Sequence, residues 1–368
     1  MIRIEKRVAL PRYHHLIAAL IAFIIAIISG SVIFICLGVN PLTAYLAMFK
    51  GVFGSFHSFS EVLVKATPLT FTGLAVAVAA MMMLWNIGAE GQLVWGGIFA
   101  AGTALYLFPS APAPLLIPLI IAASACGGMM WAMIPGLLKA RFNVNEILTT
   151  LLLNYVAIIY MEHLFYGPWR DPAGFGFPGT AQIPETAHLF RFIGTRIHLG
   201  FPIALICALL LYFILKKSTW GFQIRVIGSE VRAARYAGFN VTRQTLAVMA
   251  LSGALAGMAG MAEVCGIHYR LQTGLAVGYG YDGIIVAWLA QLNPLMVPFT
   301  AILLGALFVG GEQLQTVLGL PSTISLILEA ALLFGLFSGQ ALIKYKIALT
   351  RPADDENRAA PHRQGETP

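Results

Sequence analysis

The sequence is poor in charge. Only 11% of its 368 residues are Asp, Glu, Lys or Arg, whereas 58% are hydrophobic and the mean hydropathy is +0.80. Soluble domains carry about 25% charged residues, so a soluble globular fold is excluded. Apolar stretches of about 17 to 25 residues, the length that crosses a bilayer, recur along the chain. We therefore expect an all-α fold, a polytopic transmembrane helical bundle of about ten segments.

The marks of an enzyme are also missing. The four cysteines have no short paired spacing, the eight histidines are scattered, and no His-Glu-x-x-His occurs. We therefore expect neither a metal site nor catalytic residues. The phosphate-binding pattern G-x-x-x-x-G-K-[ST] is absent as well. Any ATP-driven work must come from another chain, and no cofactor is expected in this one.

The expected spans differ in length. The shortest, about 281–292, is bounded by Gly280 and Pro294. The others run near 16–38, 62–83, 88–108, 115–138, 147–166, 201–215, 244–264, 295–318 and 322–341.

Basic residues give these spans an orientation. Most of the 23 Lys and Arg residues fall in four segments, 1–15, 139–141, 216–243 and 344–363. All four are cytoplasmic if ten segments cross and both termini lie inside, as the excess of basic residues on the inner side requires. Lys50, Lys65, Arg170, Arg191, Arg196 and Arg270 then remain outside. The net charge of +7 is explained in this way without nucleic-acid binding.

This orientation divides the chain into three parts. Residues 1–15 form a cytoplasmic N-terminal segment and 16–345 a transmembrane domain. Residues 346–368 form a polar cytoplasmic tail that we expect to be disordered.

The helical pattern is interrupted twice. Around 68–97 a short apolar helix ends at MMMLWNIGAEG, and around 274–298 another is framed by GYGYDG and QLNP. Paired broken helices mark the central site of many transporters, because freed backbone groups face the path. We expect Asn86, Glu90 and Gln92 to line a transport path at the first break.

Other polar residues at membrane depth include Asn154 and Asp282. A buried charge in lipid is costly, so such residues face a bundle interior, a partner or a wet cavity. For each of them, hydrogen bonding between helices is as good an interpretation as solute contact. We include Asn154 and Asp282 among the residues expected to line the path. The run SGALAGMAG at 252–260 repeats small residues at spacings of three and four, which predicts close helix packing.

The basic segment GFQIRVIGSEVRAARYAGFN predicts a short surface helix. Ser229 is a natural N-cap and Gly238 a natural stop, leaving about two turns between them. We favour a helix that inserts into a groove on a cytoplasmic partner; a helix on solvent or lipid headgroups is the alternative. The residues expected to dock are Ser229, Glu230, Arg232, Arg235, Tyr236 and Gly238.

The chain resembles the permease subunits of bacterial ABC importers of the branched-chain amino acid, ribose and nucleoside type, and looks closest to nucleoside and simple-sugar permeases. The matching stretches are NIGAEGQ (86–92), FNVNEILTTLLLNY (142–155), FPGTAQIPE (177–185), ARYAGFNVTR (234–243), SGALAGMAG (252–260), GYGYDGIIVA (278–287) and LNPL (292–295).

The resemblance implies a heteromeric importer in the bacterial plasma (inner) membrane. Its other parts would be a cytoplasmic ABC ATPase, a second related permease and an extracytoplasmic solute-binding protein. The coupling helix of the family maps onto 229–238, and its break near the translocation path onto 86–92. Trp288 stands where similar nucleoside permeases tend to carry smaller residues, and we expect it to line the path.

A second hypothesis needs no ATPase. An ion-coupled secondary transporter could use the same breaks to bind a proton or sodium ion. Its coupling carboxylate would be Glu90, Asp282 or Glu263.

Overall fold

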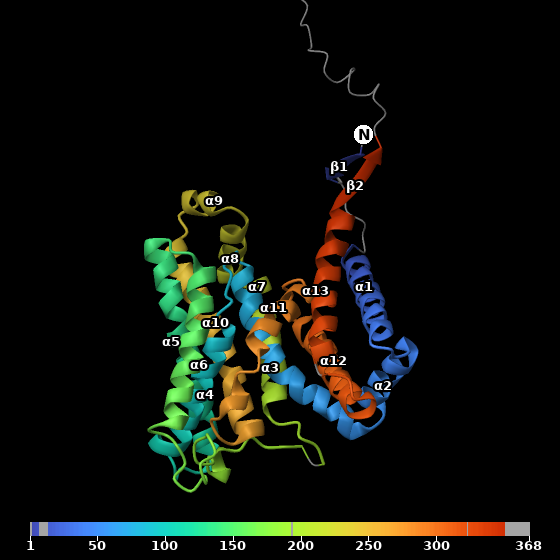
Figure 1. Cartoon of the computed structure of the whole chain (residues 1–368). Coiled ribbons are helices and arrows are strands. Elements are labelled where there is room, and N and C mark those ends of the chain that lie inside the picture. Colours follow the sequence, from blue (N-terminus) through green and yellow to red (C-terminus); the bar gives the residue numbers. More distant parts are fainter. Residues whose placement is uncertain (1, 7–13, 193, 322, 350–368) are drawn as a thin grey trace, which may run out of the picture. The chain divides into compact units, whose positions relative to one another are not determined.

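The computed structural model describes residues 2–6, 14–192, 194–321 and 323–349 (Figure 1). These residues form two compact units, one within 44–325 and one from the described residues of the two ends, within 2–43 and 326–349. The helices are α1 (His14–Cys36), α2 (Pro41–Phe53), α3 (Phe56–Ala80), α4 (Ala89–Gly102), α5 (Ala113–Phe142), α6 (Glu146–Tyr166), α7 (Gly200–Lys217), α8 (Thr219–Ser229), α9 (Val231–Tyr236), α10 (Val241–Glu263), α11 (Tyr279–Leu289), α12 (Val297–Leu318) and α13 (Thr323–Lys344).

Shorter elements complete this framework. The helices α4 and α10 each end in a π-helical turn, η1 (Thr103–Leu107) and η3 (Val264–His268). Two single 3₁₀ turns, η2 (Glu185–Ala187) and η4 (Thr273–Leu275), lie in the long loops.

The unit formed by the chain ends contains a small sheet. Strand β1 (Ile2–Lys6) pairs antiparallel with β2 (Tyr345–Leu349). Among the residues that the structure describes, this ribbon is the only sheet. It takes in the first residues of the predicted tail; 350–368 lie outside the described residues.

In the described part of the chain, six helices are long and apolar enough to cross a membrane, or seven if Phe23–Cys36 and Pro41–Phe53 count as one bent span. The expected total of about ten is not confirmed. One of the predicted spans is short, since α11 has 11 residues, whereas α4 has 14 and continues into the five residues of η1. At about 1.5 Å per residue, α11 alone does not cover the ~30 Å hydrocarbon core.

Helix α3 lies at the centre of the 44–325 unit. In its most apolar window 89% of the residues are buried, compared with 28% for α6 and for α7. Its threonines satisfy their hydroxyls within the helix; Thr70 Oγ1, for example, donates to the Ala66 carbonyl at 2.7 Å. The helix continues through Pro68, so it is longer than the short helix predicted there, and it ends at Ala80, where the predicted break MMMLWNIGAEG begins.

Glycines join α10 to its neighbours. A Cβ on Gly257 would overlap the backbone of α5 at Ser124, and one on Gly260 would overlap that of α4 at Leu93. Gly253 meets Gly128 of α5 in the same way. Only residues without side chains allow helices this close, so the packing predicted for 252–260 is confirmed.

The two ends of the 44–325 unit differ. Helices α8 and α9 lie at one end, together with the connection between α5 and α6, and the long loop 167–199 lies at the other (Figure 1). This loop contacts η3 and the residue that follows it. The Arg191 guanidinium donates to the Gly266 carbonyl at 2.8 Å and lies 4.8 Å from the centre of the Tyr269 ring.

Candidate functional site

Both predicted interruptions contain unwound backbone. The first, Met81–Gly88, joins α3 to α4, and Met83 adopts a positive φ of 57°. The second, residues 290–296, joins α11 to α12 and has positive φ at Gln291 and Leu292. Backbone of this kind is tolerated at membrane depth only where protein or a wet cavity satisfies it.

Glu90 connects the two broken segments. Its carboxylate accepts the backbone N–H of Gly278 at 2.8 Å and that of Gly280 at 2.6 Å, at the first turn of α11. The side chain is buried, with 1% of its surface exposed. An added Cβ on Gly280 would overlap the backbone of Glu90, so a glycine is required for this approach. A carboxylate is favourable here because the free N–H groups of a helix start carry partial positive charge.

Asn86 and Gln92 bond each other across the start of α4. Asn86 Nδ2 donates to Gln92 Oε1 and Gln92 Nε2 donates to Asn86 Oδ1, both at 2.9 Å. Asn86 Nδ2 also donates to Ser252 Oγ of α10 at 2.8 Å. Ser252 Oγ in turn donates to the Ala75 carbonyl of α3 at 2.6 Å. A buried network in which each amide is bonded holds the break in one conformation.

Asn154 of α6 completes this polar layer. Its Oδ1 accepts the backbone N–H of Gly91 at 2.9 Å. Its Nδ2 donates to the Ile87 carbonyl at 2.9 Å and to the Tyr281 hydroxyl at 3.1 Å. One buried amide therefore ties α6 to the starts of both α4 and α11.

The structure thus brings together four of the predicted path residues. Asn86, Glu90, Gln92 and Asn154 are buried and bond the two helix starts, while Asp282 is half-buried one turn into α11. Solute contact by these residues stays a prediction. The sequence did not single out Ser252 and Tyr281, although both lie in stretches noted for other reasons.

Trp288 occupies a different place. Its ring stacks on Trp85 of the first break, with centroids 5.6 Å apart and planes 26° apart. Trp85 is 39% exposed and Trp288 half-buried. Helix α11 therefore contacts the region of the first break twice, through Glu90 at its start and through this aromatic pair near its end.

Helix α9 lies where the short surface helix was predicted. Gly238 ends it with a φ of 79°, and Tyr236 is 94% exposed. The predicted cap is wrong, because Ser229 is the last residue of α8 and its hydroxyl donates to the Val226 carbonyl at 2.9 Å. Glu230 caps α9 instead and accepts the Arg232 N–H at 3.1 Å. In all of α9 only Ala234 is buried.

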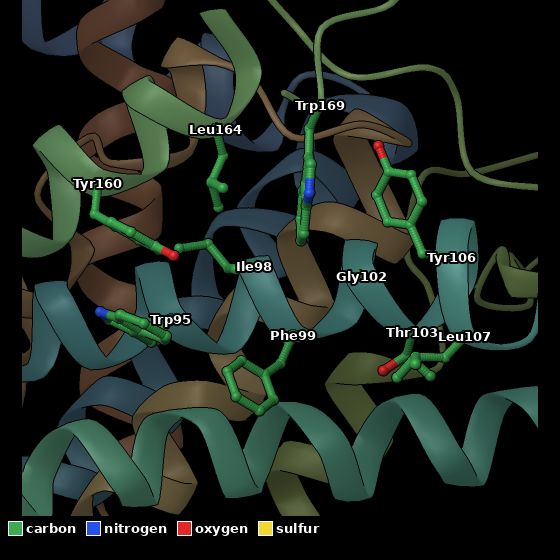
Figure 2. Close-up of a pocket in the computed structure, with 10 residues that line it drawn as sticks. All are labelled: Trp95, Ile98, Phe99, Gly102, Thr103, Tyr106, Leu107, Tyr160, Leu164 and Trp169. Atoms are coloured by element: carbon green, nitrogen blue, oxygen red, sulfur yellow. The ribbon is translucent and has the colours of Figure 1, made fainter. Parts of the chain in front are cut away.

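A cavity of about 410 Å³ opens beside α4, and its lining begins at Trp95, about one turn after Gln92 of the polar layer (Figure 2). Trp95, Tyr160, Trp169 and Tyr106 give it aromatic walls. It is completed by Ile98, Phe99, Gly102, Thr103, Leu107 and Leu164. The sequence analysis missed it, because its walls come from α4, η1, α6 and the loop after α6.

Comparison with known protein families shows to which family this chain belongs. The model described as "Branched-chain amino acid transport system / permease component" matches residues 58–337. The chain belongs to this permease family. It is a multi-pass membrane protein and the permease component of an ABC transporter.

Individual relatives cover almost the whole chain. The guanosine ABC transporter permease protein NupP of Bacillus subtilis is 35% identical over 90% of this chain and 95% of its own length. The glucose ABC transporter permease protein TsgB13 of Haloferax volcanii is 32% identical over 95% and 94%. The nucleoside ABC transporter permease protein NupB of Lactococcus lactis is 29% identical over 86% and 88%. No solved structure matches. Nothing in these relatives supports the secondary-transporter hypothesis.

Proposed function

We propose that this chain forms the translocation path of an ABC importer for a small polar solute, a nucleoside or else a simple sugar. A separate cytoplasmic ATPase supplies the energy, so this chain needs no cofactor of its own. The observation that carries the proposal is α9, a two-turn basic helix that the fold leaves almost wholly exposed at one end of the 44–325 unit. Names of relatives support the solute class, since two of the three act on nucleosides or guanosine and one on glucose.

Contacts of α8 suggest how motion of α9 reaches the path. Helix α8 leads directly into α9, and its Gly228 lies against the Met81 carbonyl, where a Cβ would overlap the oxygen. Met81 begins the first break, which carries Trp85 and ends at the polar layer around Glu90. Movement of α9 by the ATPase would therefore displace the break and the Trp85–Trp288 pair together. The docking residues are those predicted from the sequence, with Ser229 and Glu230 at the junction of the two helices.

The distribution of basic residues supports a cytoplasmic α9. Arg232 and Arg235 lie at the end of the 44–325 unit that also holds the α5–α6 connection, near Lys139 and Arg141. Arg170, Arg191 and Arg196 belong to the loop at the other end. We place both termini in the cytoplasm and the loop 167–199 outside the plasma membrane.

Two further partners complete the proposed importer. A second related permease would share the path, and an extracytoplasmic solute-binding protein would deliver the solute to the loop 167–199. We propose that the solute passes the Trp85–Trp288 pair and the layer formed by Asn86, Glu90, Gln92, Asn154 and Asp282. The permease can bind the solute with low affinity, because tight binding would slow release of the solute.

Reconstitution tests this proposal. We expect solute uptake by the complete importer in liposomes to require ATP on the α9 side. An imposed proton or sodium gradient, with this chain alone and no ATPase, should give no uptake. Gradient-driven uptake would instead establish the secondary transporter.

A further inference from the structure

The cavity beside α4 has aromatic walls on two sides. On one side the rings of Trp95 and Tyr160 stack nearly parallel, with centroids 5.2 Å and planes 6° apart. On the other, the rings of Trp169 and Tyr106 lie with centroids 4.9 Å apart and planes tilted by 46° (Figure 2). Such rings favour stacked or edge contacts with another planar ring.

Contacts with neighbouring residues fix the positions of two wall residues, Trp95 and Trp169. Trp95 stacks on Trp131 of α5 with centroids 4.7 Å apart, which fixes its plane. Trp169 extends over Gly102, where a Cβ would lie 3.0 Å from its ring atom Cη2. Because Gly102 has no side chain, the indole of Trp169 has room to lie over it.

The polar groups of the lining are few and neutral. They are the hydroxyls of Thr103, Tyr106 and Tyr160 and the indole nitrogens, with no charged side chain and no amide among the ten lining residues. In Figure 2 the Tyr160 hydroxyl points toward Ile98, into the space between the walls. A phosphate would find no cation here, and the many hydroxyls of a sugar would find too few partners. A planar heteroaromatic ring can stack on the aromatic walls and can also form hydrogen bonds with the few polar groups of the lining.

We propose that this cavity binds the nucleobase of a nucleoside by stacking, with the sugar toward the opening. The inference rests on the proposed function, since it names the solute class of the importer. Trp169 follows α6 in the loop that the proposed orientation places outside, so the cavity would receive the solute soon after its delivery. An uncharged nucleoside binds there, and a nucleotide does not.

Photolabelling of the purified complete importer with 8-azidoguanosine tests the proposal. Mass spectrometry should find the label on peptides containing Tyr106, Tyr160 or Trp169. Guanosine should compete for labelling, whereas guanosine monophosphate and glucose should not. Label confined to other peptides, or equal competition by glucose, would overturn the proposal.

Matched variants sharpen the test. Trp169→Leu should reduce labelling by about fivefold or more, the least that loss of one aromatic–base stack implies. Trp169→Phe, which keeps a ring, should retain most of the labelling. Phe190→Leu is the control, because Phe190 is 61% exposed in the same loop and outside the cavity. Equal labelling of all three variants, each shown intact by gel filtration, would contradict the proposal.

ATPase co-purification separates this inference from the function on which it rests. A preparation that retains the ATPase but shows no competed label refutes the nucleobase site and leaves the importer standing. A preparation from which no ATPase can be recovered under any condition refutes the proposed function itself.

Discussion

Gly228 of α8 lies directly against the carbonyl oxygen of Met81, the first residue after α3. No residue with a Cβ fits there without displacing one backbone from the other. The contact joins the segment that we propose to meet the ATPase with the break that leads to the polar layer.

Gly228→Val should therefore uncouple the importer. The side chain would push α8 from Met81, and we expect uptake to fall at least about tenfold while ATP hydrolysis persists. Solute uptake and ATP hydrolysis, both measured on reconstituted importers, would show whether the two activities are uncoupled. Thr219→Val is the control, because it places the same side chain at the exposed start of α8. Full uptake by Gly228→Val would remove this contact from the coupling route.

Replacing Arg232 and Arg235 together by Glu should weaken docking of the ATPase. Both side chains are exposed on α9, so the bundle should stay folded. The reversed charges should repel the ATPase surface, which we expect to be complementary to the two arginines. We expect co-purified ATPase to fall about tenfold or more, because like charges across an interface cost several kcal/mol. Arg170→Glu, in the loop at the other end, should change nothing. Normal recovery of the ATPase with the double variant would refute the docking surface.

Glu90→Gln should destabilise the unit without abolishing ATP-driven uptake. The amide offers one acceptor where the carboxylate serves the N–H groups of Gly278 and Gly280. An unsatisfied buried donor costs about 1–3 kcal/mol, so the thermal unfolding midpoint should drop. Glu162→Gln on the less buried side of α6 is the matched control. If the folded Glu90→Gln protein lost uptake, and an imposed ion gradient no longer changed the uptake rate, the ion-coupled hypothesis would be supported instead.

His198, in the loop 167–199 next to α7, should make stability depend on pH. Burial, and then the charges of Arg191 and Arg196, lowers the pKa of His198 from 6.5 to about 4. Between those values the unfolded chain binds a proton that the folded chain does not. Stability should therefore be fully present above about pH 6.5 and decline toward pH 4, by at most about 3 kcal/mol.

Thermal unfolding between pH 7.5 and 5 measures this effect. His198 Nδ1 accepts the Gly200 N–H at 3.1 Å, and the oxygen of an asparagine could take over that bond. His198→Asn should accordingly show a smaller loss of stability on acidification than the wild type. Identical pH slopes would exclude the histidine as the cause.

The sequence predicted local features well. The stop at Gly238, the glycine packing of 252–260 and the two interruptions each follow from a few neighbouring residues. The cap of α9 was harder, because Ser229 and Glu230 are both able to cap and the choice depends on where α8 ends. The expected number of spans is not confirmed. Composition does not show that α11 ends after 11 residues, which is short of a membrane thickness.

Contacts between distant segments were beyond the sequence. Asn86, Glu90, Gln92 and Asn154 were recognised as polar groups at depth, but their partners depend on how four helices meet. Glu90, for example, bonds residues 188 and 190 positions away. The aromatic cavity was missed for the same reason. Spacing of three and four residues marks one face of one helix and cannot show a wall shared by α4, α6 and a loop.

The side of the membrane on which α9 lies tests the central claim most directly. Tyr236→Cys, in a chain whose four cysteines are replaced by serine, places a thiol at a position that is 94% exposed. Phe190→Cys in the loop 167–199 serves as the opposite marker. We predict that an impermeant maleimide labels Phe190→Cys in intact cells and Tyr236→Cys only in inverted vesicles, where the ATPase should protect it. Labelling of Tyr236→Cys in intact cells would contradict the account, because no cytoplasmic ATPase could then reach α9.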